Sequence, residues 1–235
     1  NDLLVLKNKE ILVTGGCGFI GSEIVKQLSL LGANVTIIDN LSSGKERYIQ
    51  GFSNVKLITA DLLDDHAIES VVKDKEYVIN NAALPFIPDS YYMPKKFFDV
   101  NVNATISLAL AVIKEKKAKR FVHISSSEIY GTARYTPMDE NHQTTPQSTY
   151  AVSKLAGERV VFTMHKEHNL PAVIIRPFNS FGPNITQPYI IPEIIRQMEK
   201  NDVIKLGNLN AKRDLTYVTD TARGIILSLV KEGVI

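Results

Sequence analysis

A tyrosine and a lysine four residues apart carry the clearest chemical signal in this sequence. Tyr150 and Lys154 stand in the run YAVSK, inside a helical pattern that we expect from about Ser148 to His168. Side chains four residues apart lie on the same face of a helix. A lysine ammonium beside a phenol favours the phenolate and lowers the pKa of the phenol from about 10. The pair therefore predicts a general base that works near neutral pH.

A serine-rich strand end could complete this pair. The apolar run 121–124 is typical of a buried strand and leads directly into SSSE, residues 125–128. Ser126 could hydrogen-bond the same substrate oxygen that Tyr150 deprotonates. A Tyr-x-x-x-Lys pair alone is common on solvated helix faces, so its chemical meaning depends on this strand end and on a nucleotide site elsewhere in the chain.

A glycine-rich turn near the N-terminus predicts that nucleotide site. An apolar strand at 11–13 runs into TGGCGFIG, residues 14–21, and a helical pattern follows from Phe19 to Leu31. We expect Gly15 to permit the tight turn and Gly18 to let the backbone approach a pyrophosphate, while Gly21 allows close packing of helix on strand. The first residues of a helix offer free N–H groups and partial positive charge to a phosphate. In this helix they are Phe19, Ile20 and Gly21.

The residue that ends the second strand indicates which dinucleotide binds. The strand expected at 35–38 ends on Asp39. A carboxylate at this place accepts hydrogen bonds from the ribose hydroxyls of NAD and repels the 2′-phosphate of NADP. We therefore predict NAD as the cofactor, with capping of the next turn as the alternative role of Asp39. Lys45 and Arg47 follow closely, so some tolerance of NADP stays open.

Later strand ends supply further candidate residues. A strand at 55–59 is followed by Asp61, which could hydrogen-bond an adenine amino group or cap the helix expected at 64–72. A strand at 77–80 is followed by Ala82 and Ala83, whose small side chains leave room for a cofactor to lie across the strand ends. A polar Asn101 lies within the apolar stripe of a helix expected at 95–117, and such a group needs a partner. It could brace the active-site backbone or be a satisfied core amide.

The alternation of strands and helices predicts an α/β fold, a Rossmann-type doubly wound parallel sheet with right-handed crossovers. In such sheets ligands bind at the carboxyl ends of the strands, where all the candidate residues above would meet. We expect an NAD-binding domain at 1–175 that includes the Tyr/Lys helix. Residues 176–235 are expected to form part of a substrate-binding lobe.

Composition narrows the function classes. The chain has 235 residues, of which 44% are hydrophobic and 22% charged, and its net charge is +2. This charge is too small to argue for nucleic acid or a membrane surface as a partner. We find no secretory signal pattern and no apolar run that we expect to span a bilayer. The single cysteine, Cys17, cannot form an internal disulfide, which fits a cytoplasmic protein. No His, Cys and carboxylate cluster has the spacing of metal ligands, so we predict no metal.

Together these motifs resemble those of the extended short-chain dehydrogenase/reductases, in the NAD-dependent nucleotide-sugar epimerase/dehydratase family. The resemblance runs from Lys9 to Val230. Its motifs are residues 14–21, 39–41, 61–62, 125–131, 150–154, 176–179 with 181–183, and 213–220.

The resemblance implies a shared first step. Tyr150 would remove the proton of the sugar C4 hydroxyl while hydride passes from C4 to NAD, and Lys154 would also hold the nicotinamide ribose. Ser126 matches the residue that bonds the C4 oxygen. Asn179 matches a contact to the substrate diphosphate, and Arg213 matches a phosphate-binding arginine whose guanidinium suits that task. By itself Arg213 could equally be a surface ion pair with its neighbour Asp214. Further contacts are implied to the cofactor at Asn40, Asp61, Leu62, Ala82 and Ala83, and to the substrate at Ser127.

The outcome after the 4-keto intermediate depends on Glu128. This residue matches the base that removes the C5 proton in 4,6-dehydratases, although Ser127 stands where many of them have an aspartate. The segment 126–140, together with 213–224, is more similar to the UDP-N-acetylglucosamine 4,6-dehydratases. We therefore predict 4,6-dehydration of a UDP-sugar, with UDP-sugar 4-epimerase and then decarboxylase as alternatives. Glu128 also occurs in some of those enzymes, and it could simply be an exposed loop carboxylate.

Two further function classes stay open: a non-catalytic NAD-binding regulator, and an interaction protein that binds no cofactor. The family resemblance also implies a homodimer formed by the helices at 95–117 and 148–168. Members of the family commonly continue beyond the position of Ile235, so we expect the substrate lobe to be incomplete here. Residues 189–198 are expected to line the substrate entrance.

Overall fold

A computed structural model describes residues 2–185, 187–200 and 203–231 of the chain. Its centre is a parallel six-stranded sheet with the strand order β3-β2-β1-β4-β5-β6. The strands are β1 (Glu10–Thr14), β2 (Asn34–Asp39), β3 (Val55–Thr59), β4 (Tyr77–Asn80), β5 (Arg120–Ile124) and β6 (Ala172–Ile175). This confirms the predicted fold class. The order reverses between β1 and β4, and ligands bind at such a switch point in open α/β sheets.

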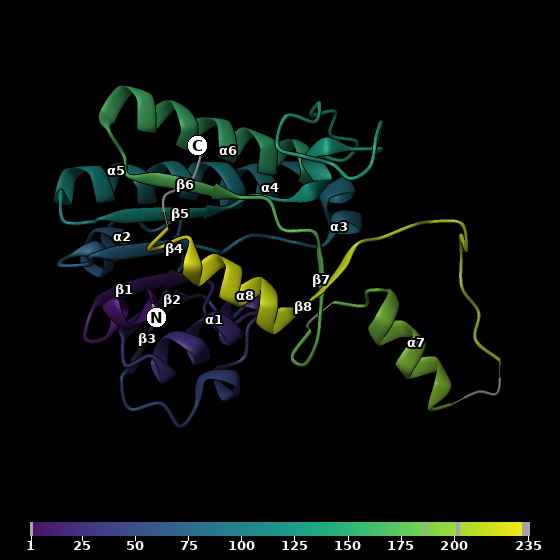
Figure 1. Ribbon diagram of the computed structural model, residues 1–235, viewed down its shortest axis with the longest axis horizontal. Coiled ribbons are helices and arrows are strands. Elements are labelled where there is room, and N and C mark those ends of the chain that lie inside the picture. The colour runs from purple at the N-terminus through teal and green to yellow at the C-terminus, as the bar shows by residue number, and fades with distance from the viewer. Residues whose placement is uncertain (1, 186, 201–202, 232–235) are drawn as a thin grey trace.

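Helices cover both faces of the sheet, and successive β1 residues show why. Ile11 and Val13 belong to the apolar cluster under the helices α1 and α8, whereas Leu12 belongs to the cluster under α2, α5 and α6. Alternate strand residues point to opposite faces, so a strand buried on both faces must be apolar throughout. Figure 1 shows α5 and α6 on one side of the strands and α1 and α8 on the other. The helices are α1 (Phe19–Leu30), α2 (Asp65–Val72), α5 (Ala104–Glu115), α6 (Thr149–His168) and α8 (Val218–Leu227).

The helix expected at 95–117 is built from three pieces. α4 (Pro94–Phe98) continues through a π-helical turn, η3 (Asp99–Asn103), into α5. Single π-turns inside helices occur frequently at functional sites. By length and composition Pro94–Glu115 could cross a membrane, so the expectation of no such run was wrong. Half of its most apolar window is buried inside the fold, as in the core helix of a globular domain.

Short elements complete the main body. These are η1 (Asp2–Leu6), η2 (Glu46–Ile49), α3 (Ile87–Tyr92) and η4 (Ser127–Tyr130). α8 falls within the segment expected to form a second lobe, yet Ala222, Ile225 and Ile226 are fully buried in the cluster that also holds α1 residues. The end of the described chain therefore returns to the core of the main sheet.

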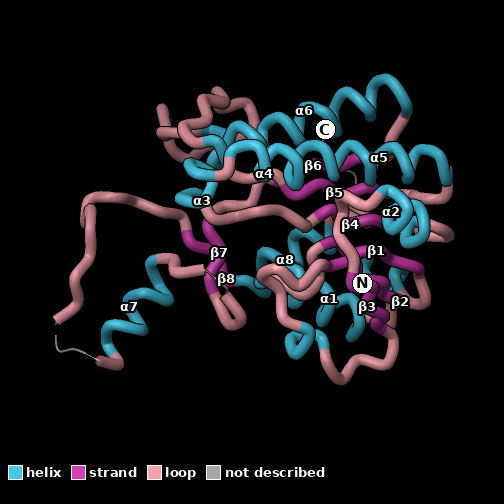
Figure 2. Tube along the Cα trace, turned by 180° about the vertical axis from the view of Figure 1, so that it is seen from behind, coloured by secondary structure: helices cyan, strands magenta, loops and turns pink. Residues whose placement is uncertain are grey.

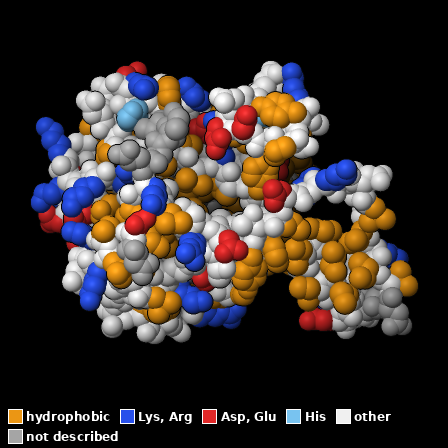
Figure 3. Space-filling view, in the orientation of Figure 1, with side chains coloured by type: hydrophobic (Ala, Val, Ile, Leu, Met, Phe, Trp, Pro, Cys, Tyr) orange, Lys and Arg blue, Asp and Glu red, His pale blue; other side chains and the backbone are white. Residues whose placement is uncertain are grey.

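An arm extends from this body. β7 (Asn179–Phe181) and β8 (Leu215–Tyr217) form a two-stranded parallel sheet, with Asn179 opposite Leu215. Between them α7 (Ile190–Met198) stands apart from the rest of the molecule (Figure 2). None of its residues is buried, and hydrophobic side chains are exposed along this part of the surface (Figure 3).

Candidate active site

The glycine-rich loop is shaped by two close approaches. Gly15 has a φ of +64°, and a Cβ there would lie 2.8 Å from the Cα of Ala82. A Cβ on Gly21 would lie 2.1 Å from the Gly15 carbonyl oxygen. At Gly18 an added Cβ would meet only that same oxygen, at 3.4 Å. Packing within the chain thus requires glycine at positions 15 and 21 but not at 18, where the predicted approach of a pyrophosphate is the remaining reason for it.

Asp39 ties this loop to the end of β2. Its Oδ2 accepts a hydrogen bond from the Cys17 N–H at 2.9 Å, and its Oδ1 accepts one from the Leu41 N–H at 2.8 Å. The residue is 9% exposed. Asp39 therefore does stabilise the turn that follows β2, as the alternative role predicted. A carboxylate has about four lone-pair sites, so contact with a ribose hydroxyl is compatible with these bonds and stays a prediction.

Asp61 does not cap the helix that follows it. The N-cap of α2 is Asp64, whose side chain accepts hydrogen bonds from the backbone of His66 and Ala67. Asp61 instead accepts one from the Asn40 side chain at 2.9 Å. The capping alternative was wrong because Asp64 is the residue that immediately precedes the first helical turn. Asp61 and Asn40 join the ends of β3 and β2 beside the glycine-rich loop.

A buried hydroxyl fixes the segment after β4. Thr14 Oγ1 donates to Asn80 Oδ1 at 3.1 Å and accepts from the N–H groups of Asn81 and Ala82 at 3.0 and 2.9 Å. The Asn80 amide also bonds Thr105 Oγ1, at 3.0 Å. These contacts hold Ala82 under Gly15. Ala83, the other predicted cofactor contact after β4, is half-buried. Leu62, the predicted cofactor contact after β3, is a core residue with 8% exposure.

Replacing Thr14 with valine should destabilise the fold. The variant keeps the shape of the side chain but leaves the Asn80 oxygen and two backbone N–H groups without their partner. Unmet buried hydrogen bonds cost about 1–3 kcal/mol each, partly relieved by relaxation. We expect a loss of about 2 kcal/mol in the free energy of unfolding, measured with urea. Thr59→Val, at an exposed position of β3, is the control, and equal effects of the two changes would contradict the argument.

The predicted catalytic pair, Tyr150 and Lys154, lies in the first turns of α6. Ser148 caps this helix by accepting a hydrogen bond from the Ala151 N–H at 3.1 Å. Tyr150 is half-buried with its ring edge-on to Phe97. Lys154 is 5% exposed and donates from Nζ to the carbonyl oxygen of Ile124 at the end of β5. Helix and sheet thus bring the pair to the carboxyl edge, beside the serine-rich strand end.

The predicted lowering of the Tyr150 pKa is not seen in the protein alone. Burial raises the pKa of the Tyr150 phenol, the Glu128 charge raises it further, and hydrogen bonding to Ser126 opposes this rise. The prediction was wrong because burial is the largest cause of the shift, while the Lys154 ammonium group is directed to the backbone carbonyl of Ile124. Burial also lowers the pKa of Lys154 to about 8, with the Glu158 carboxylate opposing that shift.

The buried ammonium group predicts a pH-dependent stability. Because the pKa of Lys154 falls from 10.5 to about 8 on folding, the unfolded chain holds more protons between these pH values, and stability rises with pH there. Below pH 8 the penalty is fully present, about 3 kcal/mol. Lys154→Met removes the titrating group. Its stability relative to the natural chain should therefore fall by about 3 kcal/mol between pH 7.5 and 10.5 in urea titrations. A difference that does not change with pH would contradict this.

Ser126 and Glu128 stand in one tight turn above the pair. The Ser126 side chain, 7% exposed, caps η4 by accepting a hydrogen bond from the Glu128 N–H at 3.2 Å. The Ser127 N–H donates to the Pro177 carbonyl oxygen at 3.0 Å, which ties the turn to the segment after β6. Glu128 is half-buried, so it is not an exposed loop carboxylate. Its charge reaches the Tyr150 phenol, whose pKa it raises.

Tyr189, the first residue of the segment expected to line the substrate entrance, joins this group. Burial raises its pKa, as do Tyr150 and Glu128, which are both near enough to act on it. Its hydroxyl lies 3.5 Å from the Pro85 carbonyl oxygen, and its ring is edge-on to Phe86. Of the segment expected to line the substrate entrance, Tyr189 reaches the site while α7 projects away from it.

Asn101, in the π-helical turn, satisfies both expectations at once. Its Oδ1 accepts from the Leu84 N–H at 2.9 Å, and its Nδ2 donates to Ser153 Oγ at 2.9 Å. Ser153 in turn donates to the Tyr150 carbonyl oxygen at 2.7 Å. Asn101 is therefore a satisfied buried amide that also braces the first turn of α6.

The predicted diphosphate contacts lie on the arm. Asn179 and Arg213 are both exposed, and Asn179 lies in β7, which pairs with β8 two residues after Arg213. Arg213 donates to the carbonyl oxygen of Lys212 at 2.8 Å. Within the described residues it makes no ion pair with Asp214. Neither Asn179 nor Arg213 is hydrogen-bonded to the Tyr150 group, so their roles stay predictions.

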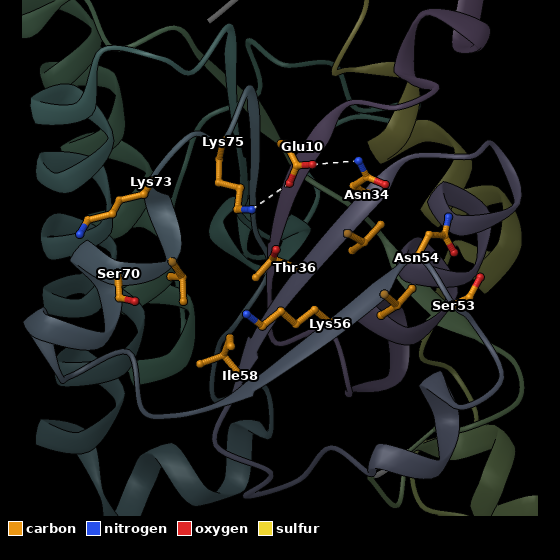
Figure 4. A pocket seen from close by; sticks show the side chains of 13 residues that line it. Glu10, Asn34, Thr36, Ser53, Asn54, Lys56, Ile58, Ser70, Lys73 and Lys75 are labelled. Atoms are coloured by element: carbon orange, nitrogen blue, oxygen red, sulfur yellow. Dashed lines mark hydrogen bonds and ion pairs between the residues drawn. The ribbon is translucent and has the colours of Figure 1, made fainter.

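A cavity lies at the opposite, amino-terminal edge of the sheet. It has a volume of about 400 Å³ and is lined by residues that include Thr36, Lys56 and Ser70. Figure 4 shows Glu10 bonded to Lys75 and Asn34 across its upper side. It lies at the wrong ends of the strands to belong to the nucleotide site.

In the part of the chain that the structure describes, no group of three or more His, Cys, Asp or Glu residues could hold a metal ion.

Comparison with known proteins decides the family. Residues 11–234 match the model of the NAD dependent epimerase/dehydratase family. The chain belongs to this family. It is 34% identical over 225 residues to a putative UDP-glucose 4-epimerase of Methanocaldococcus jannaschii, covering 93% of this chain and 73% of that protein.

Solved structures of family members agree with the fold. The UDP-N-acetylglucosamine 4-epimerase from Methanobrevibacter ruminantium superposes with a TM-score of 0.89 at 36% identity, covering 95% of this chain and 73% of that one. The dTDP-glucose 4,6-dehydratase DesIV from Streptomyces venezuelae, solved with NAD bound, gives a TM-score of 0.87 at 27% identity, over 94% and 72%. The chain is therefore an NAD-dependent nucleotide-sugar epimerase or dehydratase. The family includes both reactions, so membership alone does not choose between them.

Proposed function

We propose that this chain oxidises C4 of a UDP-linked sugar and then eliminates water across C5 and C6, a 4,6-dehydration. The observation that carries the proposal is Glu128: a half-buried carboxylate close enough to Tyr150 to raise the pKa of its phenol. Neither epimerisation at C4 nor cofactor binding needs a carboxylate at this place. Removal of the C5 proton needs a general base near the sugar, and a carboxylate can serve as one.

The residues fit NAD as the cofactor. The loop at 15–18 brings backbone close to the end of β4, and the position of Gly18 leaves room for a phosphate group. The carboxylate of Asp39 disfavours a 2′-phosphate, which supports NAD over NADP. Lys154 would hold the nicotinamide ribose, while Asn40 and Asp61 would face the adenosine half. When bound, oxidised NAD accepts the hydride that leaves C4.

The chain's own groups handle the protons. Tyr150 accepts the proton of the C4 hydroxyl, and Ser126 hydrogen-bonds the same oxygen and fixes its position. Lys154 carries a positive charge below about pH 8, and its Nζ donates to the Ile124 carbonyl oxygen at the end of β5. A 4-keto group makes the C5 hydrogen acidic, and Glu128 takes that proton as the C6 hydroxyl leaves with a proton as water. The hydride would return from the reduced cofactor to C6, and Glu128 would return a proton to C5, so that the net change is the loss of one water. Ser127, Asn179 and Arg213 would contact the substrate, the last two at its diphosphate.

A UDP-sugar 4-epimerase is the second candidate. The relatives from M. jannaschii and M. ruminantium, at 34% and 36% identity, carry 4-epimerase names. In that reaction Glu128 would have no proton to move, and Tyr150, Lys154 and Ser126 would act as above. Decarboxylation of a UDP-sugar acid and a non-catalytic NAD-binding role are further outcomes that the experiment below distinguishes.

The decisive experiment is mass spectrometry of the products formed by the purified chain with NAD and a panel of UDP- and dTDP-sugars. A product lighter by one water supports 4,6-dehydration. An unchanged mass in a new chromatographic peak means epimerisation, and loss of carbon dioxide means decarboxylation. Bound NAD with no turnover of any sugar would favour the regulator.

We also propose that the chain forms a homodimer in the cytoplasm. Large apolar side chains are exposed beside the helices expected at the interface: Tyr92 at 85%, Leu110 at 47% and Val152 at 40%. Apolar surface of this kind marks association sites. Light scattering coupled to size-exclusion chromatography tests this, and a mass of 26.2 kDa, that of one chain, would contradict it.

A further inference from the structure

A buried ion pair lies behind the catalytic residues. The guanidinium of Arg176, just after β6, binds Glu158 of α6 through both carboxylate oxygens, with Nε to Oε2 at 3.0 Å and Nη2 to Oε1 at 2.6 Å. The side chain of Glu158 is 1% exposed and that of Arg176 is 20% exposed. Removing two charges from water is costly, and such a pair is weak evidence for stability alone. Its place in the site suggests another use.

The third guanidinium nitrogen of Arg176 contacts the turn that carries Glu128. Its Nη1 donates to the Tyr130 hydroxyl at 2.9 Å and to the Glu140 carbonyl oxygen at 3.0 Å. The guanidinium carbon lies 5.2 Å from the centre of the Tyr130 ring. Tyr130 is 3% exposed and ends η4, two residues after Glu128. One side chain therefore joins the catalytic helix to the turn above it.

We propose that Glu158 and Arg176 are positioning residues, whose ion pair holds the Glu128 turn in place over the catalytic helix and presents a buried carboxylate to Lys154. This inference rests on the proposed function for the role of Glu128. It assigns to Arg176 and Glu158 no contact with substrate or cofactor. Both act through the groups that they hold.

The second half of this proposal follows from helix geometry. Glu158 lies four residues after Lys154, so their side chains share one face of α6. Burial lowers the pKa of Lys154 to about 8, and the Glu158 carboxylate opposes that shift. Two other titratable groups lie near Lys154: His123 of β5, whose pKa the lysine charge lowers, and Tyr150, one turn earlier on the same helix. Glu128 acts on Tyr150, and Arg176 is bound to Glu158. His123 is buried and its pKa is lowered well below its usual value, so its imidazole is neutral when Lys154 titrates.

Lysine titration tests the charge without cofactor or substrate. In protein labelled with 13C at the lysine Cε, the Lys154 signal, assigned through Lys154→Met, reports its own pKa by NMR. Glu158→Gln should lower that pKa by about 0.5–1 unit, because a facing negative charge is lost. Glu76→Gln is the control: it also removes a carboxylate from an ion pair, here with Lys9 and Lys119, but at the amino-terminal edge of the sheet. A Lys154 pKa unchanged in Glu158→Gln would overturn this half of the proposal.

Turnover tests the placement of Glu128. Arg176→Lys keeps the charge but cannot bind a carboxylate and a hydroxyl through one planar fork. We expect the rate of dehydration to fall at least about tenfold. The rate of C4 oxidation, measured by the absorbance of reduced nicotinamide, should change less than about threefold. Equal losses in both steps, or none, would overturn this half. Tyr130→Phe, which removes one hydrogen bond, should show the same pattern more weakly.

Two checks keep the outcomes separate. Glu158→Asp keeps the charge and should restore most of the Lys154 pKa even if Glu158→Gln folds poorly, as seen by circular dichroism. If the natural chain turns over no nucleotide sugar, the proposed function fails while the lysine titration still decides whether the pair acts on Lys154.

Discussion

Replacing Tyr150 with phenylalanine should lower turnover of a nucleotide sugar by about 10³-fold while leaving NAD binding within about twofold of its original affinity. The change removes only the phenolic oxygen, which accepts the C4 proton in the proposed reaction. A positioned general base contributes about 10²–10⁴ in rate. The ring keeps its edge-on contact with Phe97, so the fold should be preserved. Steady-state turnover and calorimetric titration with NAD measure the two effects.

A matched control is available on the loop after η4. The Tyr135 hydroxyl donates to Asp139 at 2.9 Å in an exposed position, so Tyr135→Phe removes the same atom outside the site. We expect that variant to keep full activity. If Tyr150→Phe kept more than about a tenth of the turnover, Tyr150 would not be the base. If neither the natural chain nor Tyr150→Phe turned over substrate, the non-catalytic regulator would gain support.

Replacing Glu128 with glutamine should separate the two candidate reactions. For a dehydratase we expect product formation to fall by about 10²–10³-fold, because glutamine cannot take the C5 proton. C4 oxidation should persist, since Tyr150 and Ser126 are intact, and reduced nicotinamide should accumulate. Rapid-mixing absorbance and product mass spectrometry give both rates.

Glu140→Gln is the control for this change. Glu140 is exposed on the neighbouring loop, and only its backbone carbonyl contacts Arg176. A Glu128→Gln protein as active as this control would show that no C5 proton is taken by Glu128. The epimerase would then be the better proposal. The loss of one charge beside Tyr150 should also lower the pKa of its phenol in this variant, because Glu128 raises it.

Local spacing was sufficient for the parts of the fold that a few neighbouring residues specify. Apolar runs separated by helical patterns predicted a parallel sheet, and β3 and β4 begin and end where the runs at 55–59 and 77–80 do. The glycines at 15 and 21 were recognisable because a tight turn and a close helix need them whatever surrounds them. The four-residue spacing of Tyr150 and Lys154 placed both on one face of α6 for the same reason.

Other features depend on residues far away in the chain and could not be read from it. The direction of the Tyr150 pKa shift is set by burial and by Glu128, which lies on another element. Capping of α2 by Asp64 rather than Asp61 depends on where the first turn begins. The return of α8 to α1 and the contact of Tyr189 with the site come from chain paths that no local pattern records.

By itself the sequence determined the strand–turn–helix frame, the family and the identity of the candidate chemical groups. Only the tertiary structure decided how those groups are charged and held. Thr14 bonds Asn80, 66 residues away, and Arg176 joins Glu158 to Tyr130, 46 residues before it. The physical reason is that pKa values and buried hydrogen bonds depend on desolvation and on facing partners. Those partners are brought together only when the strands and helices pack.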